Sequence, residues 1–259
     1  MLAGFFSGVN GGVVIRQDRR KLILRSDDPP GIGMPLCIKI YLQQGLLPAL
    51  RETLTRSAGE RSIANCRRLA DAGIHVPEPY GAAIERGPFG LLSRSLAATQ
   101  WIGDMASLRD HTIPLFGTVS DGDPSVAALA RSLGAFVAAL HERGIWVSDL
   151  NSGNLLVRRR QDGTFSVILV DHDDIAFPGT VYEKQRLANL SQVAALLLPL
   201  GSGTPEQVCA GYAPVAGTAD AAALARDVSA RAAAVLVRWK RDLDARFSRI
   251  GSDRRSALR

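Results

Sequence analysis

The sequence of 259 residues has few cysteines, few aromatic side chains and no long apolar run. Cys37, Cys66 and Cys209 are widely separated and odd in number, which argues against a disulfide framework and against a zinc site with C-x-x-C spacing. The apolar run at 193–200 is far shorter than the ~20 residues that a spanning helix needs. Residues 1–15 are apolar but rich in glycine and without a basic segment, so we interpret them as structure and not as a signal peptide. We therefore expect a folded cytoplasmic protein whose contact with any membrane is peripheral.

Acidic residues are the scarcer charged type, and the formal net charge is +6. Such a balance favours anionic partners, among them nucleotides, phosphorylated glycans, acidic lipid surfaces and nucleic acid. Much of the excess lies at 238–259, which could contact lipid headgroups or a glycan, or could be a solvated helix with a disordered tail. No nucleic-acid partner is expected, because the chain lacks a recognised motif and aromatics interleaved on a basic face.

The first hundred residues have the pattern of strands interrupted by helix. Helical periodicity runs over about 46–72, with an interruption near Gly59, and Pro77 and Pro79 end it. The expected strands, in chain order, are 13–16, 21–24, 36–42, 80–84 and 89–96. The order βββαββ predicts a small antiparallel sheet with one helix, followed by a linker at 97–102.

The second half is mainly helical. Asp123 is a typical N-cap with Pro124 at the first helical position, and an amphipathic stripe follows as far as Gly144. Two short apolar runs, at 155–157 and 167–170, are joined through an Asp-Gly pair that indicates a hairpin. The pattern then becomes helical again over 187–198 and in an alanine-rich stretch to about residue 247.

Three oxygen-bearing side chains flank this hairpin. Asp149 and Asn154 precede it with the spacing D-x-x-x-x-N, and Asp171 ends its second strand. Phosphoryl transfer needs a carboxylate to orient the acceptor hydroxyl and hard oxygen ligands to hold Mg²⁺ against the triphosphate. The three residues supply that set in the order of a kinase catalytic loop and metal-binding aspartate. The alternative is that they are loop caps and a turn residue, which explains each of them but not their joint arrangement.

Longer motifs around these residues resemble the lipopolysaccharide kinase family, which includes the Kdo and heptose kinases. The resemblance lies in D-L-N-S-G-N-L-L-V at 149–157 and in V-D-H-D at 170–173. It extends to A-D-A-G-I-H-V-P-E-P at 70–79 and to R-L-A-N-L at 186–190. It implies a bilobal α+β protein-kinase-like fold, with an antiparallel β N-lobe at 1–100 and a mainly helical C-lobe at 101–259. It also implies ATP and Mg²⁺ as cofactors and a sugar hydroxyl of the lipopolysaccharide inner core as acceptor.

In kinases of this fold a lysine on the third strand contacts the nucleotide phosphates. Lys39 is the basic residue inside the apolar run 36–42 and is the candidate, unless it faces water on an edge strand. Glu60 is the candidate for its helical carboxylate partner, or else lies on a solvated helix surface. The family's acid would fall a few positions later, where this chain has Ser62 and Ala64.

A glycine-rich phosphate loop is the least well matched part. Gly11 and Gly12 precede the first strand and could form a backbone cradle, although the sequence there does not fit G-x-G-x-x-G and could equally be a terminal turn. Val147-Ser148 stands where related kinases commonly have His or His-Gly just before the catalytic aspartate, and His172 stands where an aromatic is usual. We interpret His141 as a structural group at its helix end.

The sequence thus predicts an ATP- and Mg²⁺-dependent kinase with an alcohol group as acceptor, acting on an anionic glycolipid or sugar at the cytoplasmic face of the inner membrane. Asp149 would act as the base, Asn154 and Asp171 as metal ligands, and Lys39 as the phosphate contact. Two alternatives stay open: a small-molecule kinase of the aminoglycoside or choline type, and a nucleotide-binding pseudokinase that acts as a scaffold. The oligomeric state is not indicated by the sequence.

Overall fold

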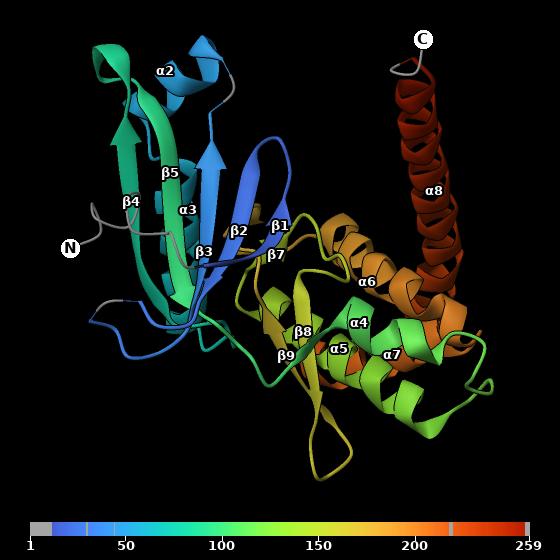
Figure 1. Cartoon of the computed structure of the whole chain (residues 1–259). Helices are drawn as coiled ribbons and strands as arrows, with labels where there is room; N and C mark the ends of the chain where they lie inside the picture. The colour runs from blue at the N-terminus through green and yellow to red at the C-terminus, as the bar shows by residue number, and fades with distance from the viewer. Residues whose placement is uncertain (1–11, 30, 44, 218–219, 257–259) are drawn as a thin grey trace. The chain divides into compact units, whose positions relative to one another are not determined.

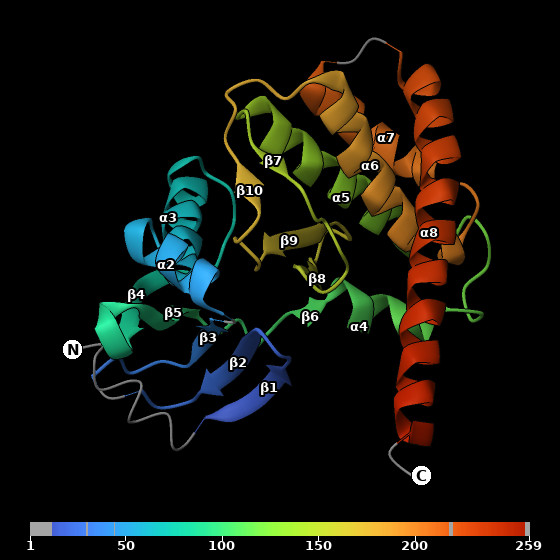
Figure 2. The ribbon, with the colours of Figure 1, turned by 90° about the horizontal axis from the view of Figure 1, so that it is seen from above.

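The computed structural model describes residues 12–29, 31–43, 45–217 and 220–256, with side chains up to residue 239. The chain divides into two compact units, which we describe separately (Figures 1 and 2). The first unit extends to Met105 and includes Ile168–Ile175, while the second contains Ala106–Val167 and continues from Ala176. The division lies near the one expected at residue 100, except that the segment carrying Asp171 groups with the first unit.

The first unit contains a five-stranded antiparallel sheet in the order β1-β2-β3-β5-β4 (Figure 1). Its strands are β1 (Val13–Gln17), β2 (Lys21–Ser26), β3 (Leu36–Leu42), β4 (Pro79–Arg86) and β5 (Leu92–Gln100). Helix α3 (Ala58–Asp71) packs against β3, β4 and β5. The five predicted strands are therefore confirmed, but β5 continues through the first residues of the expected linker.

The side chains of β3 alternate between two environments, as strand geometry requires. Ile38 and Ile40 join a buried cluster on one face, with Leu24 and Leu96 among its members. Tyr41 packs instead with Ile63 of α3 on the opposite face. Lys39 is two residues from Tyr41 and therefore shares the α3 face.

The expected single helix of this unit is two helices. Helix α2 (Leu46–Leu54) ends before Ser57, which caps α3 by accepting a hydrogen bond from the Glu60 backbone amide. The break therefore lies at 55–57 and not at Gly59. Gly59 lies in the first turn of α3, where an added Cβ atom would be 2.3 Å from the carbonyl oxygen of Leu96. Glycine here lets the helix contact the backbone of β5 directly.

The second unit is built from helices α4 (Leu108–Thr112), α5 (Pro124–Glu142), α6 (Glu183–Leu197), α7 (Thr204–Ala216) and α8 (Ala221–Ser256). Its short strands are β6 (Ala106–Ser107), β7 (Trp146–Val147), β8 (Leu155–Arg159) and the first part of β9 (Phe165–Leu169), and β10 (Ile175–Ala176) lies where the chain re-enters this unit. They form a three-stranded sheet, β6-β8-β9, and the pair β10-β7. The predicted hairpin is confirmed as β8 and β9.

Helix α5 is the predicted amphipathic helix. Asp123 caps it by accepting hydrogen bonds from the amides of Ser125 and Val126, as expected. Gly134 of α5 and Gly211 of α7 face the partner helix's backbone, and a Cβ atom at either would lie 2.0 Å from a carbonyl oxygen. Among the described helices, α5 alone is long and apolar enough to cross a membrane, yet most of that apolar window is buried inside the protein. We therefore interpret α5 as the core helix of its unit.

Candidate active site

Lys39 is held by the segment that follows β9. The residue is 9% exposed, and its Nζ atom donates to the Val170 carbonyl at 2.8 Å and to Asp171 Oδ1 at 3.0 Å. A buried ammonium group inside a strand needs such a partner, since desolvation without compensation is costly. The predicted phosphate contact and the predicted metal-binding aspartate are thus brought together in the first unit.

A second lysine reaches the same segment. Lys21, at the start of β2, donates to Asp173 Oδ2 at 2.6 Å, and its Nζ atom lies 3.7 Å from Asp171 Oδ2. The Tyr41 hydroxyl donates to Asp173 Oδ1 at 2.6 Å. The Lys21 Nζ atom lies over the Tyr41 ring, 5.2 Å from its centroid, in a cation–π contact. We call Lys21, Lys39, Tyr41, Asp171 and Asp173 the lysine–aspartate cluster.

Charge neutralisation governs this cluster. Burial alone would raise the pKa of Asp171, but the neighbouring Lys39 and Lys21 ammonium groups hold it at about 2. Burial likewise works to lower the pKa of Lys21, and the two carboxylates reverse this, so that its pKa is raised. Asp171 and Lys21 therefore both remain charged at neutral pH. Two carboxylates paired with two ammonium groups can exchange these partners for a divalent cation and a polyphosphate.

Sequence reasoning missed Lys21, Tyr41 and Asp173 as site residues. Asp173 is the second acid of the V-D-H-D motif, but the motif alone does not show which acids face the sheet. The signal for Lys21 is the strand register, because Lys21 pairs with Tyr41 and Ile23 pairs with Lys39. Residues that alternate along paired antiparallel strands share one face, so Lys21, Tyr41 and Lys39 fall together.

The backbone of the aspartate segment is fixed by further polar contacts. Asn65 of α3 donates to the His172 carbonyl at 2.7 Å, and the buried His172 ring donates through Nε2 to the Leu169 carbonyl at 2.9 Å. Burial lowers the pKa of His172 to about 4, so its ring is neutral. His172, which replaces the usual aromatic, therefore acts as a brace that fixes the turn carrying Asp171 and Asp173.

The structure corrects the expectation for Glu60. Its carboxylate accepts from the Ser57 amide at 2.9 Å and from the Ser57 hydroxyl at 2.8 Å, completing a capping box at the start of α3. These hydrogen bonds lower the pKa of Glu60. Position N3 of the helix is too early for contact with Lys39, whose carboxylate partner is Asp171 instead. The contact between α3 and the aspartate segment comes five residues after Glu60, where the Asn65 side chain donates to the His172 carbonyl.

The predicted glycine cradle is only partly within the described residues. Gly11 lies outside the described residues, and Gly12 precedes Val13, which pairs with Arg25 at the end of the hairpin opposite the β1–β2 turn. Gly12 is thus separated from Lys21 by the length of β1, roughly 15 Å at 3.3 Å per residue. The β1–β2 turn itself has no glycine, and Asp18 Oδ1 accepts from the amides of Arg20 and Lys21 at 2.8 and 2.9 Å. Those two amides are therefore already bonded.

The predicted catalytic loop lies in the second unit, between β7 and β8. Asp149 is exposed, and its Oδ2 accepts from Asn151 Nδ2 at 2.8 Å. Asn154 Nδ2 donates to the Asp149 carbonyl at 3.1 Å, which leaves its amide oxygen as the end suited to a cation. Asn151 Oδ1 accepts from the Gly153 amide at 2.9 Å. The two predicted residues are thus tied together by one short turn, and Asn151 orients the carboxylate.

Helix α6 anchors this loop through two amides that the sequence did not single out. Asn189 donates to the Val147 carbonyl at 2.6 Å, and Gln192 donates to the Ser148 carbonyl at 3.0 Å. Gln192 Oε1 also accepts from the Leu150 amide at 3.4 Å. Asn189 belongs to the R-L-A-N-L motif, so the function of that motif here is to hold the residues before Asp149.

His141 completes the support of this loop. It is 3% exposed, its Nε2 lies 3.1 Å from Asn189 Oδ1, and its Nδ1 lies 3.2 Å from the Tyr212 hydroxyl. Because Asn189 uses its nitrogen for Val147, its oxygen must accept, and the His141 proton therefore sits on Nε2. Burial lowers the pKa of His141 to about 4. The histidine is a neutral bridge between α5, α6 and α7, and not a cation at the helix end.

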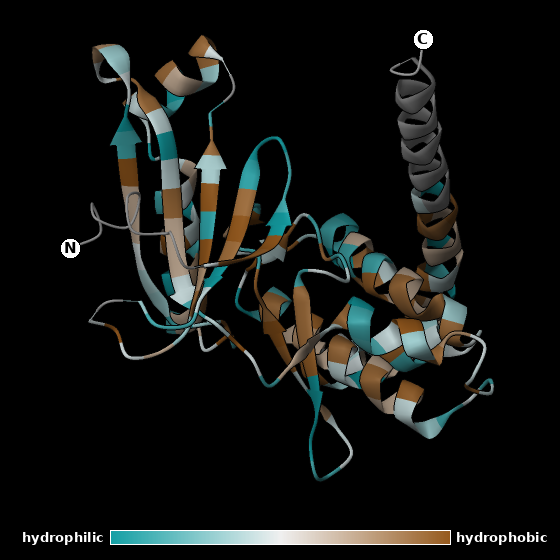
Figure 3. Cartoon of the chain, in the orientation of Figure 1, coloured by the Kyte–Doolittle hydropathy of each residue, from teal (hydrophilic) through white to brown (hydrophobic). Residues whose placement is uncertain are grey.

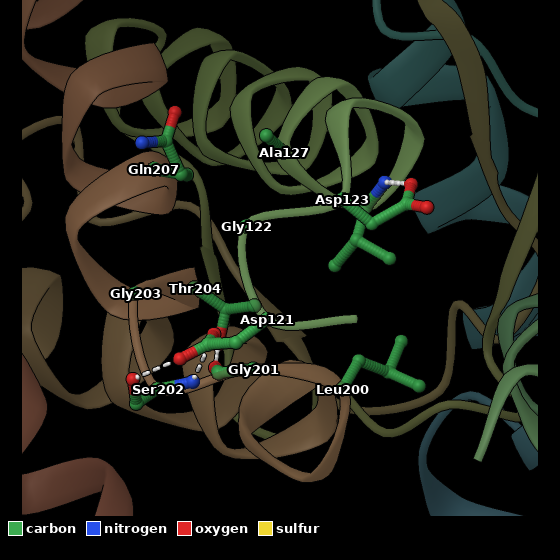
Figure 4. A pocket seen from close by; sticks show the side chains of 11 residues that line it. Asp121, Gly122, Asp123, Ala127, Leu200, Gly201, Ser202, Gly203, Thr204 and Gln207 are labelled. Carbon is green, nitrogen blue, oxygen red and sulfur yellow. Dashed lines mark hydrogen bonds between the residues drawn. The ribbon is translucent and has the colours of Figure 1, made fainter. Parts of the chain in front are cut away.

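A separate hollow of about 330 Å³ lies between the loop before α5 and the loop before α7. Figure 4 shows the Asp121 side chain directed toward Ser202, whose amide and hydroxyl donate to it at 3.0 and 2.8 Å. None of the predicted site residues lines this hollow. We interpret Asp121 as a cap for the chain that enters α7, and assign no chemistry to the hollow.

Comparison with known proteins identifies the family. Residues 44–212 match the model of the "Lipopolysaccharide kinase (Kdo/WaaP) family". The chain belongs to this family. The matched span contains Asp149, Asn154 and Asp171, whereas Lys21 and Lys39 precede it. The resemblance drawn from the catalytic loop is therefore confirmed at the level of family.

Curated relatives in this family match about half of the chain. A "3-deoxy-D-manno-octulosonic acid kinase" of Mannheimia succiniciproducens is 30% identical over 142 residues, which cover 52% of each protein. One of Pasteurella multocida is 26% identical over 151 residues, covering 56% of this chain and 58% of the relative. The chain thus spans between half and three fifths of the relatives it matches.

A solved structure extends the likeness over nearly the whole chain. The structure described as "WaaP in complex with acyl carrier protein" aligns with a TM-score of 0.62 at 16% identity, covering 90% of this chain and 88% of that one. The protein-kinase-like α+β fold is therefore confirmed. At this identity the comparison carries the fold and not the substrate.

Proposed function

We propose that this protein transfers a phosphoryl group from ATP to a sugar hydroxyl of the lipopolysaccharide inner core. The observation that carries the proposal is the lysine–aspartate cluster, in which a buried lysine of β3 is paired with the aspartate after β9. The names of the curated relatives favour 3-deoxy-D-manno-octulosonic acid (Kdo) as the acceptor, with heptose as the second choice.

The residues present fit a nucleotide with Mg²⁺. Asp171 stays ionised, and the amide oxygen of Asn154 adds a second hard oxygen donor of the type that Mg²⁺ accepts. Mg²⁺ would neutralise the charge on the transferred group. Lys39 and Lys21 would hold the phosphates, each exchanging a carboxylate for a phosphate oxygen. In this assignment the amide cradle of a glycine-rich loop is replaced by the side chain of Lys21.

Asp149 would orient and deprotonate the acceptor hydroxyl. Its exposed carboxylate has one oxygen bonded to Asn151, which fixes the direction of the group and leaves it accessible. A carboxylate with this restraint is suited to general-base work during phosphoryl transfer. Because ATP is the phosphoryl donor and the acceptor is an inner-core glycolipid, we place the protein at the cytoplasmic face of the inner membrane as a peripheral protein.

The test measures phosphate transfer from radiolabelled ATP to a deacylated Kdo-containing core glycan in the presence of Mg²⁺. Wild type would be compared with Asp149→Asn and Asp171→Asn, each checked for native folding by its thermal unfolding. Transfer to the glycan that both substitutions abolish supports the proposal. Transfer to an aminoglycoside or choline instead of the glycan, or ATP binding without transfer to any acceptor, would contradict it.

A further inference from the structure

An apolar surface of the first unit has no covering within the described part of the chain. Helix α2 exposes four leucines, and the adjacent β4–β5 turn exposes a phenylalanine. We call the five residues the α2–Phe89 surface; their exposed fractions are Leu46 69%, Leu47 79%, Leu50 43%, Leu54 77% and Phe89 99%. Figure 3 shows the apolar colouring of α2 at the end of the sheet.

Helix α2 is oriented contrary to the usual rule for amphipathic helices. Leu46, Leu50 and Leu54 recur at intervals of four and form one stripe, which in a helix of a folded protein normally faces the core. Here the buried residue of the helix is Ala49, and the leucine stripe is exposed. A helix of nine residues is marginal without packing of its apolar face. The exposed stripe therefore indicates a contact that the described residues of the chain do not supply.

Phe89 projects from the tip of the β4–β5 turn, in the short 3₁₀ segment η2 (Pro88–Gly90). Its backbone has φ 59° and ψ 19°, a left-handed conformation that a phenylalanine rarely adopts. Arg86 donates to the Gly90 carbonyl at 2.8 Å and holds the turn in this form. The turn is thus built to present an aromatic ring to the outside.

The helix and the turn lie side by side. The Leu92 amide, which starts β5, donates to the hydroxyl of Thr53 in α2 at 2.8 Å. Both views in Figures 1 and 2 place α2 and η2 at the same end of the sheet. The five apolar side chains therefore belong to one end of the unit.

Arginines lie near this surface along the chain, and the glutamates near it form local hydrogen bonds and ion pairs. Residues 42–61 and 84–94 contain five arginines and three glutamates. The glutamates bond locally: Glu52 with Arg61 at 3.2 Å, Glu85 with Arg94 at 2.7 Å, and Glu60 in its capping box. The remaining arginines are exposed; they are Arg51, Arg56 and Arg86. The balance of charge around the leucines is therefore positive.

We propose that the α2–Phe89 surface docks the protein on an anionic phospholipid bilayer. The leucines and Phe89 enter the boundary of the acyl chains, and Arg51, Arg56 and Arg86 contact lipid phosphates. An anionic bilayer fits this surface, because exposed leucines and a phenylalanine suit insertion among acyl chains, and exposed arginines beside them suit lipid phosphates. The inference deepens the proposed function. It rests on that function in one respect, namely that the acceptor is a lipid.

The test is co-sedimentation of the full chain with vesicles of phosphatidylethanolamine and phosphatidylglycerol, and with vesicles of phosphatidylcholine alone. The double variant Leu47→Glu/Phe89→Glu is expected to lower partitioning into the anionic vesicles by about tenfold or more, because it places two charged side chains at the boundary of the acyl chains. The variant Arg51→Gln/Arg56→Gln is expected to lower it by about fivefold per arginine on anionic vesicles, and to leave the weaker binding to phosphatidylcholine unchanged.

A matched control is Ile113→Glu in the second unit, because Ile113 is also an exposed apolar residue, at 52%, but is not part of the surface. Its partitioning should equal that of wild type, and thermal unfolding should show that all variants fold. Equal loss in Ile113→Glu or no loss in Leu47→Glu/Phe89→Glu would overturn the proposal. A change from dimer to monomer in light scattering that accounts for the loss would overturn it as well. Capture of a small acidic protein in place of vesicles would overturn it too.

Measuring turnover with the soluble, deacylated glycan distinguishes a failure of this inference from a failure of the proposed function. The surface variants should keep wild-type turnover on that acceptor, because none of the exchanged residues belongs to the lysine–aspartate cluster or the catalytic loop. Vesicle binding without phosphate transfer would refute the proposed function and leave the docking surface standing. Transfer to the soluble glycan without vesicle binding would refute the docking surface alone.

Discussion

Lys21 and Lys39 reach the same carboxylate from neighbouring strands, with Nζ atoms 3.7 and 3.0 Å from the two oxygens of Asp171. Each lysine is therefore in a position to receive a phosphate when a divalent cation takes the carboxylate. The pairing also places two acidic and two basic residues together, so that their formal charges balance. We therefore expect nucleotide binding to exchange the partners of these charged groups without adding net charge to the cluster.

Lys39→Ala should weaken ATP binding by about tenfold to a hundredfold, the cost of losing a charged hydrogen bond of roughly 1.5–3 kcal/mol. The lost ammonium also leaves Asp171 with Lys21 as its cationic partner, so the pKa of Asp171 should rise from about 2. Isothermal titration calorimetry with a non-hydrolysable ATP analogue measures the affinity. Unchanged affinity would remove Lys39 from the phosphate site.

Lys21→Met should also weaken binding of the analogue, by about tenfold, because we assign the Lys21 ammonium to the phosphates. The matched control is Arg20→Gln, the preceding residue on the same turn, which is exposed. The effect of Lys21→Met should be larger for ATP than for adenosine, which lacks phosphates. Equal losses for the two ligands would indicate that Lys21 only supports the fold.

Asp149→Asn should lower turnover by about 10²- to 10⁴-fold, the usual contribution of a general base. Its affinity for the ATP analogue should stay close to that of wild type, since the substitution keeps the size of the side chain in a different unit from Lys39. Turnover is followed by phosphate transfer, and affinity by calorimetry. Turnover near the wild-type rate would require another base.

Glu60→Ala should lower the free energy of unfolding by about 0.5–2 kcal/mol, the range for loss of a helix cap. It should leave the affinity for the ATP analogue unchanged, because Glu60 bonds to Ser57 and not to Lys39. Urea unfolding of Glu60→Ala, Ser57→Ala and the double variant gives the coupling between the two residues. A marked loss of nucleotide affinity in Glu60→Ala would restore it as the partner of Lys39.

Stability should fall as pH decreases from about 6.5 to 4. Burial lowers the pKa values of His141 and His172 to about 4, so between these limits the unfolded chain binds protons that the folded chain excludes. Each histidine should cost roughly 2 kcal/mol at pH 5 relative to neutral pH. Urea unfolding at several pH values measures this slope. His141→Gln should give a shallower slope than wild type, and an equal slope would show that His141 does not contribute.

The sequence was sufficient for the strands, for α5 with its Asp123 cap, and for the hairpin that follows Asn154. These depend on local patterns: alternation, a capping residue and an Asp-Gly turn. It was also sufficient to identify the family, because Asp149, Asn154 and Asp171 lie close together along the chain. Lys39 was recognised because it is the one charged residue in the apolar strand 36–42.

Contacts between distant segments were harder to predict. Glu60 was expected beside Lys39. Its carboxylate instead forms local hydrogen bonds with Ser57, three residues earlier, in place of a long-range contact. Lys21 and Tyr41 join the site only through the register of β2 on β3. Asn189 holds Val147 from 42 residues away. None of these pairings can be recognised from the sequence of a single segment.

The contact of Gly59 with Leu96 bears on how activity is controlled. In protein kinases the corresponding helix is a regulatory element whose position switches the enzyme on and off. Here the helix touches the strand backbone to backbone, and the Gly59 amide donates to the buried Ser95 hydroxyl at 3.1 Å. Outward swinging of α3 would break this junction and withdraw Asn65 from His172. We therefore expect α3 to stay in place during the reaction cycle, so that the rate of turnover follows the supply of nucleotide and acceptor.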